Sequence, residues 1–252
     1  MNQIPKDGET MNDTDETVLT VDAKPWPIGI DIARTAVIVV DMQNDFGTKS
    51  GIFDRAGIDI SMIQAAIAPT ARVVAAGREA GMKVIYLKMA FRSDLSDAGP
   101  PDSPNATRHM HFGAGKAVLA PNGEQSRLLI RDTWNTDIVD ALKPQAGDVV
   151  IYKHRFSGFY ETELDATLKQ LGTKYLIVTG CTTSVCVEST IRDAMFRDYS
   201  CVLLADCAAE PIGCELPRSN HEASLLVIQT LFGWVSESAA FTRALAASHV
   251  AA

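Results

Sequence analysis

A cysteine at the start of a predicted helix is the residue of this sequence best suited to chemistry. Cys186 lies shortly after the apolar segment 175–178, which is typical of a β-strand, and at the start of a helical pattern. A cysteine in the first turn of a helix faces unpaired backbone N–H groups and the positive end of the helix dipole, and both favour the thiolate. Cys186 is therefore a candidate nucleophile, although a free cysteine among valines is more often a small buried hydrophobic residue.

Two charged residues follow other predicted strands. Asp41 comes directly after the β-branched run 36–40, and Lys153 comes directly after the apolar run 148–152. Separately, an Asp after a strand commonly starts a turn, and a Lys there is usually solvated. In an open parallel sheet, ligands bind outside the carboxyl ends of the strands. The sequence therefore predicts that Asp41, Lys153 and Cys186 converge at one edge of the sheet.

The motifs around these three residues resemble those of the isochorismatase-like cysteine hydrolases. The resemblance covers residues 28–245 and rests on the runs 41–46 and 180–187 and on Lys153 followed by the run 156–159. Within it, the runs 185–193 and 232–236 look most like the branch that holds the biuret, triuret and ureidoacrylate amidohydrolases. The resemblance implies that Asp41 is the general acid/base, Lys153 its electrostatic partner and Cys186 the nucleophile.

The chemistry that the resemblance implies is hydrolysis through a thioester. Asp41 takes the proton of the Cys186 thiol, the thiolate attacks a carbonyl carbon, and Asp41 returns the proton to the departing amine or ammonia. Lys153 would keep Asp41 ionised in a dry site. Backbone N–H groups of Thr182 and Cys186 would form the oxyanion hole. The resemblance also implies a cis peptide bond between Cys181 and Thr182.

The expected substrate is a small ureido compound. The runs 91–101 and 206–211 look closest to the biuret-type enzymes. Biuret, hydrolysed with release of ammonia, is therefore the preferred substrate, and triuret and ureidoacrylate are the alternatives. Nicotinamidase-like and N-carbamoylsarcosine amidase-like reactions are more remote alternatives.

Candidate substrate-binding residues are aromatic, amide and cationic. Phe46 and Phe156 could form walls of the pocket, although aromatic residues near strand ends more often belong to the core. Gln229 lies among apolar residues, and its amide could recognise a urea group as both donor and acceptor, although a Gln in this setting is more often buried and satisfied by the protein itself. A carboxylate substrate would need a cation, and the candidates are Arg92, Arg108 and Arg155.

The order of the predicted elements defines the fold class. Short apolar runs alternate with helical patterns, among them residues 60–80, 162–171, 185–196 and 219–232. This alternation predicts a three-layer, Rossmann-like α/β domain with a parallel β-sheet flanked by helices. Residues 91–116 show little periodicity and are expected to form a long loop, which could serve as a lid. The polar, acidic residues 1–27 are expected to form a flexible N-terminal arm, and residues 28–252 the hydrolase domain.

Composition restricts the partners and the location. Of 252 residues, 46% are hydrophobic and 21% charged, and the net charge of −8 argues against nucleic acid and acidic membranes as partners. No apolar run reaches the roughly 18 residues of a membrane span, and the start of the chain does not resemble a signal peptide. We therefore expect a cytoplasmic enzyme that acts on a small molecule. The acidic arm and the terminus around Trp234 suggest a homo-oligomer, with a tetramer favoured.

The sequence predicts no metal and no cofactor. The five cysteines include no C-x-x-C pair, which argues against a disulfide framework and a thiolate zinc site. His109 and His111 could ligate a metal, but they lie in a loop-like segment. Nicotinamidases of this superfamily bind a metal through Asp-x-His after the second strand, where this chain has Met-Ala-Phe-Arg at 89–92. No glycine-rich phosphate-binding motif follows a predicted strand.

Two readings from other classes of protein remain open. A thiol-redox protein using Cys181 and Cys186 would need both cysteines, whereas the hydrolase should need only Cys186. A catalytically silent binding module is also known in this superfamily, but silent members lack one of the three residues that this chain retains.

Overall fold

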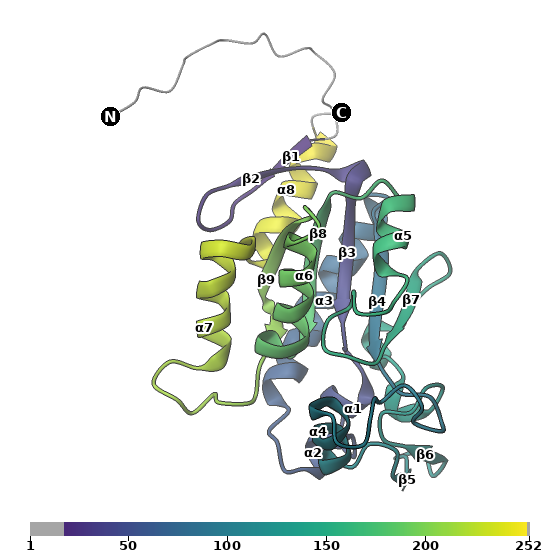
Figure 1. Ribbon diagram of the computed structural model, residues 1–252. Helices are drawn as coiled ribbons and strands as arrows, with labels where there is room; N and C mark the ends of the chain where they lie inside the picture. The colour runs from purple at the N-terminus through teal and green to yellow at the C-terminus, as the bar shows by residue number, and fades with distance from the viewer. Residues whose placement is uncertain (1–17, 251–252) are drawn as a thin grey trace.

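A parallel sheet of six strands lies at the centre of the computed structural model, which describes residues 18–250 (Figure 1). In spatial order, the strands are β10 (Trp234–Ser236), β9 (Ser200–Ala209), β8 (Tyr175–Cys181), β3 (Thr35–Val40), β4 (Lys83–Met89) and β7 (Val149–Lys153). Every pairing is parallel. The central strand β3 is buried along its whole length, as expected of a β-branched run covered on both faces.

Helices cover both faces of the sheet and bury a separate apolar core on each (Figure 1). One face carries α3 (Ser61–Glu79) and α8 (Ser238–Val250). The other carries α5 (Leu164–Gln170), α6 (Glu188–Met195) and α7 (Asn220–Val227). The predicted three-layer α/β fold is confirmed. None of the helices within residues 18–250 is both long and apolar enough to span a membrane.

Two of the predicted helices contain a π-helical turn. The segment η4 (Thr183–Val187) precedes α6, and η5 (Ile228–Phe232) follows α7. The expected helices 185–196 and 219–232 are therefore each divided into an α part and a π part. Single π turns are found frequently at functional sites, and η4 contains Cys186.

Small elements gather beyond the carboxyl ends of β3 and β4 (Figure 1). They include the short helices α1 (Asn44–Gly47) and α2 (Ile52–Arg55) and the hairpin strands β5 (Ala117–Leu119) and β6 (Gln125–Arg127). The 3₁₀ turns within residues 18–250 are η1 (Ile32–Arg34), η2 (Trp134–Thr136) and η3 (Asp140–Leu142).

The segment 91–116 is not the structureless loop that was expected, because it contains helix α4 (Pro104–Phe112). The Ser103 side chain accepts a hydrogen bond from the Ala106 N–H, and Pro104 occupies the first turn, where no intrahelical donor is needed. Gly113 ends the helix with a φ of 98°, a conformation that glycine adopts without strain. The helix lacks clear apolar periodicity because it buries only Ala106 and His109.

The ordered domain begins earlier than the boundary expected at residue 28. Strand β1 (Val18–Val21) pairs antiparallel with β2 (Ile28–Asp31), and the side chain of Val21 is fully buried. The Lys24 N–H donates to the Val235 carbonyl at 2.8 Å, which joins this hairpin to β10. The expectation of an arm is therefore wrong for residues 18–27, and residues 1–17 lie outside the described part of the chain.

Candidate active site

The ends of three neighbouring strands bring Asp41 and Lys153 together. Asp41 follows β3 and Lys153 is the last residue of β7, on either side of β4. Lys153 Nζ lies 2.7 Å from Asp41 Oδ2, and both side chains are essentially inaccessible to solvent. The Met89 N–H at the end of β4 donates to Asp41 Oδ1 at 2.9 Å. Asp41 has a φ of 52°, which Asp tolerates better than most residues.

The surroundings of this ion pair suit a carboxylate that exchanges protons. Burial raises the pKa of the Asp41 carboxyl, while the charge of Lys153 and hydrogen bonds from Lys153, Cys186 and Met89 oppose that rise. Burial by itself would lower the pKa of Lys153, but its neighbours, with the charge of Asp41 the largest effect among them, oppose this, and the pKa of Lys153 is raised. Lys153 therefore stays a cation, and Asp41 can gain and lose a proton beside it.

Cys186 joins the pair from the π-helical turn after β8. Its side chain interacts with those of Asp41 and Lys153 and is 7% exposed. A side chain at Gly180 would collide with the Val40 carbonyl oxygen, so glycine is needed for β8 to approach the end of β3. Sequence-based reasoning thus placed Asp41, Lys153 and Cys186 at one sheet edge, and the structure brings all three into contact.

Cys186 is a neutral thiol at rest rather than a preformed thiolate. Burial raises its pKa, and the lowering effect of Lys153 is smaller than the effect of burial. The helix terminus alone therefore does not ionise the thiol, because desolvation penalises the anion more strongly than the helix dipole favours it. Deprotonation requires a base in contact with the sulfur, which is the position that Asp41 occupies.

The turn before Cys186 contains the two residues expected to supply the oxyanion hole. The peptide bond between Cys181 and Thr182 is cis. The Thr182 carbonyl accepts hydrogen bonds from the Val185 and Val187 N–H groups at 3.1 and 3.2 Å, which fixes the turn. Thr182 and Cys186 both line the cavity in front of the thiol.

That cavity has a volume of about 150 Å³ and walls that are mostly apolar. A dry cavity of about this size can hold a molecule as large as benzene. Phe46 and Phe156 line it, as the sequence analysis expected. The other side chains around the reacting groups come from α2, β4, α4, η4 and two loops, and they are Ile52, Phe53, Met89, Arg108, His109, Phe112, Leu129, Val185 and Ile212.

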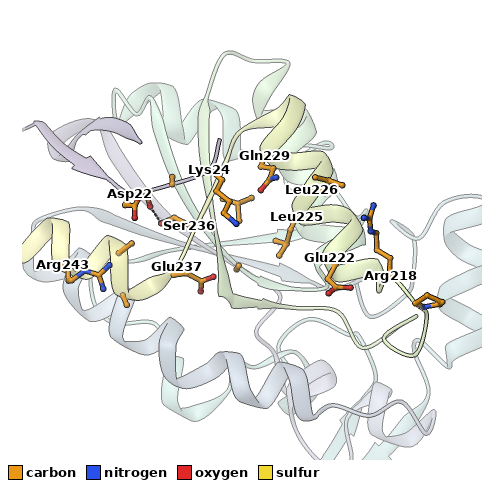
Figure 2. A pocket seen from close by; sticks show the side chains of 16 residues that line it. Asp22, Lys24, Arg218, Glu222, Leu225, Leu226, Gln229, Ser236, Glu237 and Arg243 are labelled. Atoms are coloured by element: carbon orange, nitrogen blue, oxygen red, sulfur yellow. Dashed lines mark hydrogen bonds between the residues drawn. The ribbon is translucent and has the colours of Figure 1, made fainter. Parts of the chain in front are cut away.

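Two of the candidate substrate-binding residues lie elsewhere. Gln229 is on η5 and lines a separate open groove of about 820 Å³, where Figure 2 shows it above Lys24. Arg92 is exposed and is not among the residues that line the cavity. Neither side chain lines the cavity in front of Cys186, because Gln229 lies on η5, which contacts β10 at the far side of the sheet, and Arg92 is exposed. A role for these two residues in substrate binding stays a prediction.

Arg155 and Arg108 differ in whether the guanidinium group is free to bind a ligand. The Arg155 guanidinium donates to the carbonyls of Asp97 and His154 at 2.9 and 2.7 Å and stacks over Tyr160, so its hydrogen-bonding capacity is largely used. Arg108 projects from α4, and it is the one arginine of residues 18–250 that lines the cavity. No hydrogen bond or ion pair of its guanidinium is formed within these residues. It is therefore the cation available to an anionic ligand.

Helix α4 also supplies a residue that the sequence analysis assigned to a loop. His109 lies between the rings of Phe91 and Phe156, and its Nδ1 is 2.8 Å from the Asn105 carbonyl oxygen. Burial lowers its pKa, so the ring is neutral. The sequence feature that could have placed His109 in the wall of the cavity is the spacing of Arg108, His109 and Phe112, which puts them on one side of a helix.

The two histidines do not form a metal site. His111 is exposed, whereas His109 is buried in the wall of the cavity. Within residues 18–250, no group of three or more His, Cys, Asp or Glu side chains is arranged to hold a metal ion.

A buried Asp–Lys pair beside a thiol at the carboxyl edge of a parallel sheet defines a cysteine hydrolase site. Residues 35–240 match the model of the isochorismatase domain. Among solved structures, a cysteine hydrolase from Pseudomonas syringae pv. phaseolicola 1448A is 30% identical with a TM-score of 0.73, over 87% of this chain and 95% of that chain. The chain therefore belongs to the isochorismatase family.

Curated relatives cover nearly the whole chain. Ureidoacrylate amidohydrolase RutB of Methylorubrum extorquens is 44% identical over 227 residues, which are 90% of this chain and 89% of the relative. RutB of Serratia proteamaculans is 41% identical over 233 residues, 92% of this chain and 91% of the relative. The structure of N-carbamoylsarcosine amidase from Thermoplasma acidophilum shares the fold, with 24% identity and a TM-score of 0.60 over 81% of this chain and 96% of that chain.

Proposed function

We propose that this protein is a cysteine amidohydrolase whose substrate is ureidoacrylate or a closely similar ureido acid. That it hydrolyses an amide C–N bond of a ureido compound follows from its family and from relatives named ureidoacrylate amidohydrolase. The observation that carries the finer proposal is Arg108, a cation in the wall of the mostly apolar cavity that Cys186 also lines. These relatives and this arginine favour the carboxylated alternative over biuret, the substrate preferred from sequence.

In the first half of the reaction, Asp41 removes the Cys186 proton as the sulfur attacks the ureido carbonyl carbon. The electron pair of the C=O bond moves onto oxygen, where N–H groups of Thr182 and Cys186 stabilise it. When the intermediate collapses, the C–N bond to the aminoacrylate nitrogen breaks and Asp41 returns the proton to that nitrogen. The product leaves, and the carbamoyl group remains on sulfur as a thioester.

In the second half, water replaces the departed amine. Asp41 takes a proton from the water, the oxygen attacks the carbamoyl carbon, and the C–S bond breaks with return of the proton to Cys186. The carbamic acid released decomposes to ammonia and carbon dioxide. Throughout, Lys153 keeps a positive charge beside Asp41, and apolar walls such as Phe156 exclude bulk water from the thioester.

The substrate's carboxylate explains the placement of Arg108. A charge-assisted hydrogen bond contributes about 1.5–3 kcal/mol, equivalent to tenfold or more in KM. The Asp41–Lys153 pair is balanced and buried, so it offers no net charge to a second carboxylate. Biuret and triuret lack an anionic group and would leave Arg108 without a partner.

The test compares kcat/KM for ureidoacrylate, biuret and triuret in the wild type, Arg108→Gln and Arg92→Gln. We expect ureidoacrylate to be preferred and R108Q to raise its KM at least tenfold with little effect on biuret. R92Q, which removes an equal charge outside the cavity, should behave as the wild type. A preference for biuret, with an unchanged KM for ureidoacrylate in R108Q, would reject the proposed substrate.

A further inference from the structure

Glu210 is a fully buried acid that takes no part in the reaction described above. It directly follows β9 and lies next to the turn that follows β8, because Cys181 and Ala209 are paired in the sheet. Its Oε2 accepts hydrogen bonds from the Ser184 N–H at 3.0 Å and from the Ser184 hydroxyl at 2.5 Å. Its Oε1 accepts the Ile212 N–H at 3.1 Å. Both carboxylate oxygens are therefore directed at backbone or side-chain donors and away from the substrate.

These hydrogen bonds cap the turn that carries the nucleophile. The first N–H groups of a helix have no partner within the helix, and a side chain at the N-cap usually satisfies one of them. In η4 the N-cap residue Thr182 forms no such bond through its side chain. Glu210 supplies the missing acceptor from the neighbouring strand, and Ser184, which it holds, lies between the two proposed oxyanion donors, Thr182 and Cys186.

A second contact holds the same turn. The Thr183 hydroxyl lies 2.9 Å from His221 Nδ1, at the start of α7. Glu210 is the first residue of the connection between β9 and α7, and His221 is the second residue of α7. This connection also contributes Ile212 to the wall of the catalytic cavity. Thr183 and Ser184, two consecutive residues of η4, are thus both held by side chains from the segment 210–221.

The carboxylate does not promote thiolate formation. Burial is the main reason that the pKa of Cys181 is raised, and the negative charge of Glu210 adds to it. A fixed negative charge beside this turn makes any thiolate there harder to form. The contribution of Glu210 to this turn is therefore carried by its hydrogen bonds to Ser184.

We infer that Glu210 is a positioning residue, which acts through Ser184 to hold the oxyanion donors and Cys186 in the geometry that the reaction requires. A displacement of about 1 Å in such a constellation can cost a hundredfold in rate. The rate effect rests on the proposed amidohydrolase reaction, whereas the ordering of the turn does not.

The test uses Glu210→Gln with Glu222→Gln as the matched control. Glu222 is also a capping carboxylate, since it accepts from the Ser219 N–H at 3.0 Å, but it is exposed and forms no hydrogen bond with η4. We expect E210Q to lower kcat at least tenfold with KM within threefold of wild type, and E222Q to leave both unchanged. Kinetics use whichever amide the wild type hydrolyses, so failure on ureidoacrylate alone contradicts only the proposed substrate.

Amide hydrogen exchange provides a readout that needs no substrate. In E210Q, the peptide containing residues 182–187 should exchange at least tenfold faster than in the wild type, and in E222Q it should not change. If E210Q does not fold, Ser184→Ala removes only the hydroxyl bond and should give a smaller change in the same direction. Unchanged exchange of this peptide, or unchanged kcat, in the folded variant would overturn the inference.

Discussion

Replacing Lys153 by Met removes the cation from a fully buried ion pair and should leave Asp41 protonated. At 2.7 Å and an effective dielectric constant of about 20, the attraction between the two charges is about 6 kcal/mol. Because each 1.4 kcal/mol changes an equilibrium tenfold, its loss shifts the protonation equilibrium of Asp41 by up to roughly ten-thousandfold towards the acid. A protonated Asp41 cannot accept the Cys186 proton, so we expect kcat at neutral pH to fall at least a hundredfold.

The pH dependence of the variant distinguishes this cause from general damage. In K153M, kcat should rise about tenfold for each pH unit as the ionised fraction of Asp41 grows. Lys88→Met is the matched control, because Lys88 is also a buried lysine, lies on the adjacent strand β4 and is absent from the cavity wall. K88M should retain near-normal kcat. Thermal unfolding of both variants checks the fold, and a K153M enzyme with a flat pH profile or more than a tenth of wild-type activity would refute the reasoning.

Three further predictions concern the thiol, metals and stability. Cys186→Ser should abolish turnover, because a serine hydroxyl is poorly activated by a carboxylate alone, while the exposed Cys214→Ser should not change kcat. If Cys181→Ser lost as much activity as Cys186→Ser, the redox interpretation would be favoured, because a thiol-redox reaction needs both cysteines. Dialysis against a strong chelator should leave the rate unchanged, and reactivation by added zinc or iron would contradict this. Burial raises the pKa of Asp45 from 3.8 to about 7, so the folded state holds this proton more tightly than the unfolded state does. The contribution of this protonated carboxyl to the free energy of unfolding is fully present below pH 3.8 and is lost as pH rises to about 7, a decrease of roughly 4 kcal/mol at most. Asp45→Asn should remove this pH dependence from chemical denaturation curves.

The catalytic residues could be predicted from sequence because their positions follow from topology. A buried β-branched run followed by a polar residue marks the carboxyl end of a parallel strand, and all such ends lie at the same edge of the sheet. This rule alone was enough to predict that Asp41 and Lys153 lie close together. The ionisation of Cys186 was less predictable, because the number of apolar side chains that enclose it depends on segments distant in sequence.

Binding residues were harder to predict, because sequence does not show which side of a helix or loop faces the cavity. Gln229 has an attractive side chain but lies in the groove near β10, whereas Arg108 was one of three equivalent candidates until α4 placed it at the cavity. Helix α4 itself was missed because its evidence is in its caps, Ser103 and Gly113, rather than in apolar periodicity. The expected homotetramer and cytoplasmic location remain predictions.

The central claim is that Cys186 carries the carbamoyl group of the substrate as a covalent intermediate. Intact-protein mass spectrometry of enzyme mixed with ureidoacrylate and quenched in acid within one turnover tests it directly. We expect the protein mass to increase by one carbamoyl group in place of a proton, with peptide mapping to Cys186 and no adduct in Cys186→Ser. Rapid turnover with no adduct at any quench time, or an adduct on another residue, would contradict nucleophilic catalysis by Cys186.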